Sequence, residues 1–314
     1  MSPKLGIRTI SQPGQYLLAR AALCADFTVP ELARGLGLAA HTIRFGIRTL
    51  EERNIARKLW VIDLFRLGWS RYNILFSIGL QTKSLKQKLL RTLCASKQCL
   101  YLTENGGDFD YELSIVGRDT SDALEYLHNI SRTFGPVFMN KSVTSRSRIA
   151  LFPRKYLATG KPLKPEIDMT QTSEHVEVDS HDEAILRLMA NDGTLSNRDI
   201  AQKLGMASTF VDYRIRRLRE NKVLLGAVFA VNNVNYGAQS YILALYSKGF
   251  DCKLSEAIYH FARAHPHCTH FIECFGAWDY ELGIEVLNYE QLTSFREELG
   301  EKFADSINSM KVLA

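Results

Sequence analysis

Two short stretches of the chain combine basic, hydroxyl and aromatic side chains at the spacing of an exposed helix face. Arginine can pair with a guanine edge through two hydrogen bonds, and hydroxyl groups at the start of a helix can meet phosphates. These side chains therefore predict contacts with double-stranded DNA, with a solvated basic face as the alternative. The candidates are His41, Thr42, Arg44, Phe45 and Arg48 in the first stretch, and Ser208, Thr209, Asp212, Tyr213, Arg216 and Arg217 in the second. Three further basic residues are expected to contact phosphates or to be simple surface residues: Arg214, Arg219 and Lys222.

A second pair of candidate sites comes from a repeated tetrapeptide. The sequence Asp-Tyr-Glu-Leu begins at Asp110 and again at Asp279, 169 positions later, and each copy follows a glycine, Gly107 or Gly276. Glycine lets a backbone approach closely, and a carboxylate beside it can hold an ammonium group. The alternative is that these residues only shape a turn before a strand. The shared offset predicts a duplicated unit of about 150 residues.

A cluster of possible metal ligands lies near the second tetrapeptide. It consists of His265, His267, Cys268, His270 and Cys274. Residues 269–275 should form a strand, so that alternate side chains point to opposite faces and only some could converge. Because no standard ligand spacing is met, we expect no metal site.

The composition is that of a soluble globular protein with room for two to four domains. The chain has 314 residues, of which 46% are hydrophobic and 23% charged, and both fractions are ordinary. No apolar run reaches the roughly 18 residues of a membrane span, and the N-terminus lacks a secretory apolar core. The six cysteines have irregular spacings, which is typical of reduced thiols. We therefore expect a cytoplasmic protein with no membrane partner.

The net charge of +5 conceals an asymmetry between the two halves of the chain. Residues 1–157 contain 23 lysines and arginines against 12 aspartates and glutamates, a net charge of +11. The remainder contains 16 against 22, a net charge of −6. A basic half favours a polyanionic partner, and opposite charges on two related units also favour their packing on each other.

Residues 12–55 have the apolar spacing and the start and stop signals of three helices. Thr28 can cap a short helix together with Glu31, and Gly37 ends that helix in a tight turn. A further helix, over about residues 41–53, is apolar on one face and basic on others. This arrangement predicts a helix-turn-helix.

The helix-turn-helix pattern begins again at residue 182. A shift of 168 positions superposes Gly205 on Gly37 and Arg216 on Arg48, so the repeat includes the helix-turn-helix. Gly46 lies inside the third helix of the first copy, where glycine costs on the order of 1 kcal/mol relative to alanine. The two copies are therefore not expected to bind DNA equally.

Each helix-turn-helix is followed by strands and helices in the order βαββαβ, which is the ferredoxin-like arrangement. In the first copy we expect strands at 73–80, 99–103, 111–116 and 136–143, and helices at 84–95 and 121–134. In the second copy we expect strands at 241–246, 269–275, 280–286 and 307–313, and helices at 254–264 and 289–303. The predicted fold class is α+β, with two winged-helix-type helix-turn-helix domains, each followed by a ferredoxin-like sensor domain.

A change of composition separates the two copies. Residues 158–180 contain Gly160, Pro162 and Pro165 and show no apolar periodicity, so we expect a linker there. The predicted domains are a helix-turn-helix at 1–58, a sensor domain at 59–157, the linker at 158–180, a second helix-turn-helix at 181–226 and a second sensor domain at 227–314.

The second half carries motifs whose order and spacing are typical of a known family. They are Asp199-Ile200-Ala201-Gln202-Lys203-Leu204-Gly205-Met206, then Val211, Arg214, Ile215 and Leu218, then Gly237, and then Phe275-Gly276-Ala277-Trp278-Asp279-Tyr280. A helix-turn-helix followed by a ferredoxin-like domain with Gly-x-x-Asp before a strand resembles the leucine-responsive regulator/AsnC (feast/famine) family of transcription regulators. The resemblance covers nearly all of the chain except the linker, twice over. The fusion of two units in one chain departs from the family pattern.

The resemblance implies a sequence-specific DNA-binding transcription regulator that responds to a small effector, often an amino acid. The effector would bind near the Gly-x-x-Asp turn, which assigns effector binding to Gly107, Asp110, Gly276 and Asp279. It also implies self-association into a homo-oligomer. Two fused helix-turn-helix domains predict half-sites separated by a whole number of turns, about 34–36 Å each.

An enzyme is the alternative function. Proteins that resemble this family include siroheme decarboxylases, whose chemistry would need His, Tyr or Arg side chains that converge in the sensor-domain cavity. The available residues of these types are His128, His260, His270, Tyr111 and Tyr280. No nucleophile–base spacing or phosphate-binding loop occurs elsewhere, so we predict no catalytic residue and no cofactor. The arginines of both third helices favour the regulator.

Overall fold

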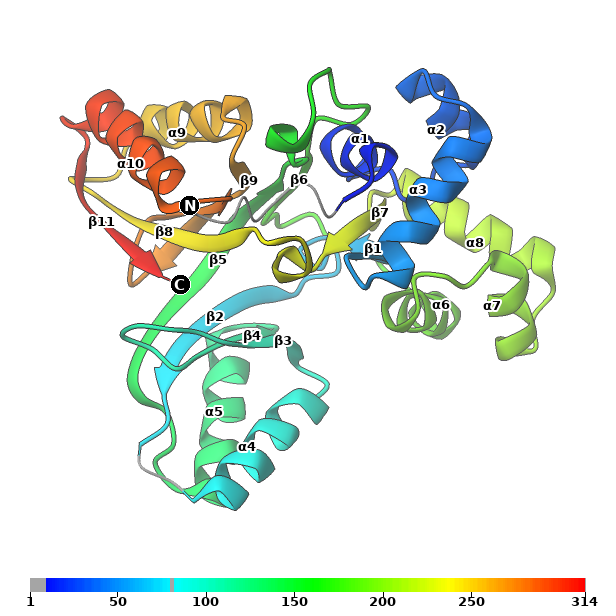
Figure 1. Cartoon of the computed structure of the whole chain (residues 1–314). Helices are drawn as coiled ribbons and strands as arrows, with labels where there is room; N and C mark the ends of the chain where they lie inside the picture. Colours follow the sequence, from blue (N-terminus) through cyan, green and yellow to red (C-terminus); the bar gives the residue numbers. More distant parts are fainter. Residues whose placement is uncertain (1–9, 80–81, 314) are drawn as a thin grey trace.

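The computed structural model describes residues 10–79 and 82–313. Two helix-turn-helix units lie at one end of the molecule, and two mixed α/β units lie at the other (Figure 1). The first head consists of α1 (Gln12–Arg20), α2 (Val29–Leu36) and α3 (Ala40–Glu52), and the second head of α6 (Ser180–Asn191), α7 (Asn197–Leu204) and α8 (Ser208–Glu220). Within the described ranges, no helix is long and apolar enough to cross a membrane.

Local signals set the bounds of the short middle helix in each head. Thr28 accepts a hydrogen bond from the amide of Glu31, whose side chain accepts one from the amide of Thr28 in return. Ser196 and Asp199 form the same reciprocal pair in the second head, which stabilises a helix start because it satisfies free amides. Both helices end at glycines with positive φ, 67° at Gly37 and 64° at Gly205. The predicted helix-turn-helix arrangement is confirmed in both copies.

Gly46 has a packing function inside α3. A Cβ atom at this position would lie 2.9 Å from Leu17 Cδ1 and 3.1 Å from Pro13 Cβ. These distances are too short for an added methyl group, so only glycine lets α1 lie this close to α3. The intrinsic helix cost of Gly46 is therefore offset by close contact between the two helices.

The two sensor domains each have the predicted βαββαβ order. The first sensor domain contains β2 (Ser70–Ser77), α4 (Lys83–Ala95), β3 (Cys99–Glu104), β4 (Tyr111–Gly117), α5 (Thr120–Phe134) and β5 (Met139–Leu151). The second contains β8 (Gln239–Ser247), α9 (Cys252–Ala264), β9 (Cys268–Gly276), β10 (Tyr280–Val286), α10 (Tyr289–Phe303) and β11 (Ile307–Leu313). The α+β fold class is thus confirmed, whereas the exact domain bounds stay a prediction.

Strand β5 joins the two sensor sheets into one. It pairs antiparallel with β2, with Arg71 opposite Arg146, and also with β9, with Leu151 opposite His270. The strand order of the joined sheet is β11-β8-β10-β9-β5-β2-β4-β3. In Figure 1 the sensor helices lie on the outer sides, with α9 and α10 on the second sheet and α4 and α5 on the first. The helix-free faces therefore share an interior.

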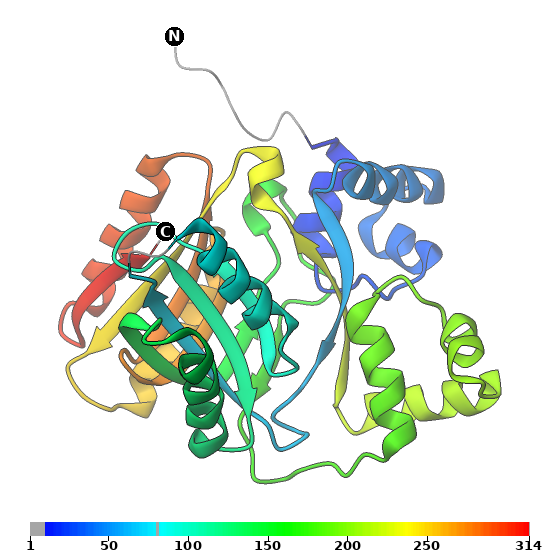
Figure 2. The same ribbon diagram turned by 90° about the horizontal axis from the view of Figure 1, so that it is seen from below.

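A two-stranded ribbon that was not predicted connects the two halves. Strand β1 (Ala56–Ile62) follows the first head, and β7 (Leu224–Val231) follows the second. They pair antiparallel with Ala56 opposite Val231, so the strand after each head pairs with its counterpart instead of forming a separate hairpin. Figure 2 shows both heads on the same side of the molecule, with the ribbon beside them.

Each head packs against the opposite half of the chain. The core of the first head includes Phe229, Tyr236 and Ala238, and the amide of Phe229 donates a hydrogen bond to the carbonyl of Ala22 at 2.8 Å. The core of the second head is completed by side chains from the first half, including Trp60. The two units are therefore intertwined.

The predicted linker is more ordered than its composition indicated. Residues 158–180 contain β6 (Ile167–Thr170), which pairs antiparallel with β5. Ile167 and Met169 on β6 are buried in the interior between the sheets. No strand was expected in this segment, because only alternate residues of a short edge strand are apolar and the signal is correspondingly weak.

Candidate functional site

The third helix of the first head presents a basic face. Ile43 and Leu50 are buried, while His41, Arg44 and Arg48 are exposed, as the helical spacing predicts. Thr42 is half-buried and Phe45 is exposed. Arg48 lies 3.6 Å from Glu52 in an exposed ion pair one turn away. Part of the basic face is therefore neutralised within the helix itself.

The third helix of the second head also presents polar side chains to the outside. Val211, Ile215 and Leu218 are buried and form its inner face. Ser208, Thr209, Tyr213 and Arg216 are exposed, and no ion pair of Arg216 occurs among the described residues. This face is therefore free to meet a phosphate or a base edge.

Two of the predicted DNA-contacting arginines have partners inside the second head. Arg214 lies 2.6 Å from Asp179 and 3.3 Å from Asp182. Arg217 also pairs with Asp182, whose side chain is fully buried. These ion pairs fasten α8 to the start of α6, so Arg214 and Arg217 position the helix. The Asp179 and Asp182 capping pair at the start of α6 was the sequence signal for these partners.

The aspartates of the repeated tetrapeptide make equivalent turn contacts. Asp110 accepts a hydrogen bond from the amide of Ile78 at 3.0 Å. Asp279 accepts one from the amide of Ser247 at 2.7 Å and another from its hydroxyl at 2.9 Å. Ile78 and Ser247 are themselves 169 positions apart. This geometry favours the turn-forming interpretation, and effector binding at these aspartates stays a prediction.

The two glycines that precede these aspartates differ. Gly276 has a φ of 139°, and a Cβ atom there would lie 2.5 Å from the carbonyl oxygen of Val143. It therefore allows β9 and β5 to approach where the two sheets join. Gly107 has a φ of 98°, but an added Cβ would contact nothing within 4 Å. Only the second glycine is required by close packing.

The glutamates of the repeated tetrapeptide converge on one arginine in the interior. Arg146 on β5 lies 2.9 Å from Glu281 and 3.3 Å from Glu112, and all three residues are buried. The hydroxyl of Tyr101 donates to Glu112 at 2.7 Å and accepts a hydrogen bond from Arg146 at 2.8 Å. The indole of Trp278 donates to Glu281 at 3.0 Å. The sequence signal was a glutamate within an apolar strand in both copies, which we had not interpreted.

The electrostatics of this cluster follow from burial and pairing. Burial lowers the pKa of Arg146, but Glu281, Tyr101 and Glu112 outweigh that effect and hold the pKa well above its ordinary value. Burial raises the pKa of Glu112, with a smaller opposing effect from Arg146. The arginine is thus firmly charged, and Glu281 is its closer carboxylate.

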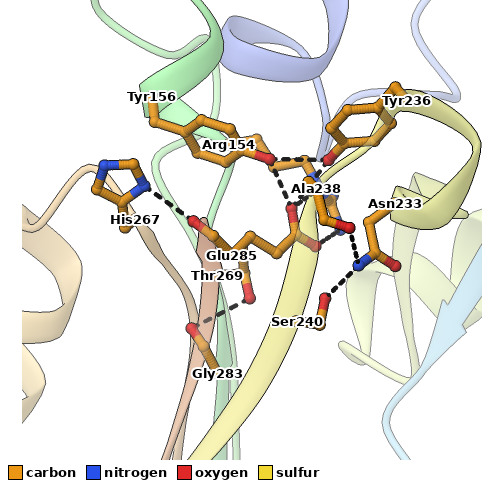
Figure 3. Close-up of polar contacts among 10 residues, drawn as sticks. All are labelled: Arg154, Tyr156, Asn233, Tyr236, Ala238, Ser240, His267, Thr269, Gly283 and Glu285. Carbon is orange, nitrogen blue, oxygen red and sulfur yellow. Dashed lines mark hydrogen bonds and ion pairs between the residues drawn. The ribbon is translucent and has the colours of Figure 1, made fainter. Parts of the chain in front are cut away.

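A second buried arginine–glutamate pair lies at the end of β10 (Figure 3). Arg154 donates two hydrogen bonds to Glu285, at 2.8 and 2.7 Å. The hydroxyls of Tyr156 and Tyr236 each donate to the same carboxylate at 3.1 Å. His267 bonds to the backbone carbonyl of Glu285 at 2.8 Å. The carboxylate is fully surrounded, and the group ties the segment after β5 to the second sensor domain.

A cavity of about 570 Å³ lies between the ribbon and the helix-free faces of the sheets. Its polar lining consists of Arg71, Tyr101, Glu112, Arg146 and His270. Its other lining residues are Leu59, Trp60, Val61, Ile62, Leu64, Leu100, Ile149, Leu151, Met169, Ala190, Val228, Ile242 and Ile272. Burial lowers the pKa of His270 to about 4, so this imidazole is neutral near neutral pH.

The five residues considered for the enzymatic alternative do not converge, although the cavity is lined by residues of all three types that it needs: Arg71, Tyr101, Arg146 and His270. His270 lines the cavity, whereas Tyr111 and Tyr280 lie in the cores under the sensor helices. His260 is exposed beside Glu256, and His128 lines a separate surface depression. The cavity therefore presents one of the five residues.

The predicted absence of a metal site was tested only in the part of the chain that the structure describes. There, no group of three or more His, Cys, Asp and Glu side chains could hold a metal ion. His265 contacts the Phe295 ring edge-on at 4.5 Å, and the Cys268 thiol donates to the carbonyl of His270 at 3.3 Å. The candidate ligands thus have separate partners.

Sequence comparison identifies the second head directly. Residues 178–219, which span α6, α7 and nearly all of α8, match an AsnC-type helix-turn-helix domain. The chain is 29% identical over 127 residues to the HTH-type transcriptional regulator FL11 of Pyrococcus horikoshii, covering 40% of this chain and 82% of the relative. It is 48% identical over 50 residues to the Bkd operon transcriptional regulator of Pseudomonas aeruginosa, covering 16% of this chain and 33% of the relative.

Structural comparison supports the fold of the whole chain. The siroheme decarboxylase NirDL superposes with a TM-score of 0.60 over 96% of this chain and 90% of its own, at 13% identity. At this identity the likeness concerns the fold, and a fused pair of such units is therefore not peculiar to this protein. The second head is thus an AsnC-type helix-turn-helix, and the chain is similar to transcription regulators over part of its length.

Proposed function

We propose that this protein is a sequence-specific DNA-binding transcription regulator whose two heads act from one polypeptide. The observation that carries this proposal is the pair of helix-turn-helix heads on one side of the molecule, each with an arginine on its exposed third-helix face. The β1–β7 ribbon links the heads, and Arg219 of the second head lies 3.3 Å from Asp26 of the first. These links favour recognition of two half-sites at a defined separation.

The proposed base and phosphate contacts are the exposed members of the two third helices. In the first head they are His41, Thr42, Arg44 and Arg48, and in the second Ser208, Thr209, Tyr213 and Arg216. Arg214 and Arg217 act indirectly, because their ion pairs fix the angle of α8. A small effector, such as an amino acid, self-association into a homo-oligomer and a cytoplasmic location belong to the same proposal.

Salt-dependent DNA binding tests the proposal. Fluorescence anisotropy with genomic duplex fragments should show binding at micromolar protein. Affinity should fall steeply with added salt, because each phosphate contact releases counterions. Absence of salt-sensitive binding to any fragment would refute a regulator, and equal affinity for all fragments would refute sequence specificity.

The enzymatic alternative has two observations in its favour: the whole-chain fold shared with a siroheme decarboxylase, and a cavity lined by residues of the required types, including Tyr101, Arg146 and His270. Against it, the cavity brings in His270 but not the other four candidate residues. The absorption spectrum of the purified protein separates the two functions. A tetrapyrrole spectrum together with no duplex binding would replace the regulator by the enzyme.

A further inference from the structure

Two arginines line the cavity at opposite positions of neighbouring strands, and only one of them is paired with carboxylates. Arg71 on β2 lies directly opposite Arg146 on β5 in the antiparallel ladder. Arg146 has two glutamates within hydrogen-bonding distance. No hydrogen bond or ion pair of the Arg71 side chain occurs among the described residues. Like charges at opposite ladder positions are destabilising, so Arg71 is a cation that the protein leaves unpaired beside another cation.

The electrostatics of Arg71 agree with this geometry. Burial, and then the charge of Arg146, lower the pKa of Arg71 to about 10. The guanidinium is still charged near neutral pH. Tyr101, Asp63 and Glu281 have smaller opposing effects that raise the pKa of Arg71, and Asp63 accepts a hydrogen bond from the amide of Phe65 at 3.0 Å. An anion in the cavity would therefore stabilise Arg71.

Three hydrogen-bond donors around the cavity are buried without an acceptor in the described part of the chain. They are the Nε–H groups of Arg71 and Arg146 and the indole N–H of Trp60. All three residues line the cavity. Buried donors without acceptors are rare because each forfeits its hydrogen bonds to water. A group with several acceptor oxygens would satisfy them.

Of the other lining residues, Tyr101, Glu112 and His270 are polar, and Glu112 is paired with Arg146. The rest of the cavity wall is apolar. Leu59 and Val61 come from β1, Val228 from β7, Ile242 from β8 and Ile272 from β9. A volume of about 570 Å³ is within the range of sites for small organic ligands, which combine apolar walls with a few polar anchors. The imidazole of His270 is neutral and adds no second charge. The lining thus fits one anionic group on an apolar body.

We propose that this cavity binds a small monocarboxylic acid with an apolar body. The carboxylate accepts hydrogen bonds from Arg71 and Trp60. The apolar body lies against the β1–β7 ribbon, which connects the two heads. Binding at this site is independent of DNA binding, and only its regulatory consequence rests on the proposed function. The site differs from the Gly-x-x-Asp turns, whose aspartates already accept backbone amides.

Matched acids and amides test the proposal on the full chain. The probes are phenylacetate and 4-methylpentanoate, each compared with its primary amide by calorimetry and by tryptophan fluorescence, since Trp60 lines the cavity. At least one acid should bind at least about tenfold more tightly than its amide, because charge-assisted hydrogen bonds form only with the acid. No binding of either acid at millimolar concentration would overturn the proposal, as would equal affinity for acid and amide.

Substitution of Arg71 tests whether the acid binds in this cavity. Arg71→Gln should abolish the preference for acid over amide, and it should retain the fold because it removes a repulsion with Arg146. Arg57→Gln is the matched control, because Arg57 is exposed on the β1–β7 ribbon and lies outside the cavity. If Arg71→Gln does not fold, Trp60→Phe should reduce the same preference. An unchanged preference in the variant that folds would overturn the assignment.

The same protein preparations distinguish failure of this site from failure of the proposed function. Anisotropy with genomic duplex fragments is measured first without any acid. DNA binding without acid binding would refute the cavity site alone. Acid binding without DNA binding would retain the site and refute the regulator.

Discussion

The two halves of the molecule have the same order of elements, but residues at equivalent positions make different contacts. Glu285, at the end of β10 in the second half, forms an ion pair with Arg154. The position 169 residues earlier is the apolar Val116. Glu281 and Glu112, by contrast, are both retained and meet at Arg146. Both halves therefore contribute a glutamate to the contacts of Arg146 on the central strand, whereas the contact with Arg154 has no equivalent at Val116.

The largest expected effect concerns the ion pair that Glu285 of the second half forms with Arg154 of the first. Glu285→Gln leaves the largely buried Arg154 side chain without its charged partner, which should lower the free energy of unfolding by about 3–5 kcal/mol. Val116→Ala, at the equivalent position, should cost clearly less because no charge is left unpaired. Urea denaturation measures both values, and similar losses would contradict the divergence of the two halves.

The Glu285→Gln variant should also differ from the unchanged protein in how its stability depends on pH in acid. Although burial raises the pKa of Glu285, Arg154 and the two tyrosines outweigh it and hold the pKa below its ordinary value. The stabilisation is therefore fully present above the unfolded pKa of about 4.3 and is lost as pH falls through the lower folded value. Denaturation at several pH values below about 4.3 should show a smaller acid dependence in Glu285→Gln than in the unchanged protein.

The glutamates that both halves retain should differ in strength. Glu281 is closer to Arg146 and also accepts from Trp278, so Glu281→Gln should cost about 3 kcal/mol. Burial already disfavours the charged form of Glu112, so Glu112→Gln should cost about 1–2 kcal/mol. A double-mutant cycle would measure their coupling through Arg146. Equal single losses would mean that the cluster is symmetric.

The two heads should contribute unequally to DNA binding. Arg216→Ala should weaken binding about tenfold, the order expected for loss of one bidentate contact. Arg48→Ala should weaken it less, because Arg48 is shared with Glu52. Anisotropy on a bound genomic fragment measures both, with the exposed Arg187→Ala on α6 as control. Negligible losses in both heads would remove both arginines from the contact surface.

The smallest difference is expected at the repeated aspartates. Asp279→Ala removes two hydrogen bonds and should cost about 1–2 kcal/mol, while Asp110→Ala removes one and should cost about 1 kcal/mol or less. Thermal denaturation would show this order. An effector response that disappears in a folded Asp279→Ala protein would instead support ligand contact at the turn.

Local sequence signals predicted most of the fold. The caps at Thr28 and Ser196 and the glycines at Gly37 and Gly205 specify the helix-turn-helix because they act within a few residues of the chain. Strands β1 and β7 were missed because each pairs with the other, 162 or more positions away. Their stability depends on a partner that no local window contains.

The interior site was less predictable than the fold. The tetrapeptide repeat was recognised, but effector binding was assigned to its aspartates because the family resemblance implied it. Its glutamates look like solvent-facing strand residues until the second sheet and Arg146 are in place. Arg71 has no motif at all, and its unpaired state emerges only from the ladder position opposite Arg146.

Each head packs against the opposite half of the chain, and this has a consequence for folding during synthesis on the ribosome. The first head emerges early, but Phe229 and Tyr236, which complete its core, emerge more than 170 residues later. Closure of such long loops slows folding and leaves apolar surface open to aggregation or chaperones in the meantime. The nascent first half should therefore remain partly folded until the second half has been synthesised. Both heads should then complete their folding together.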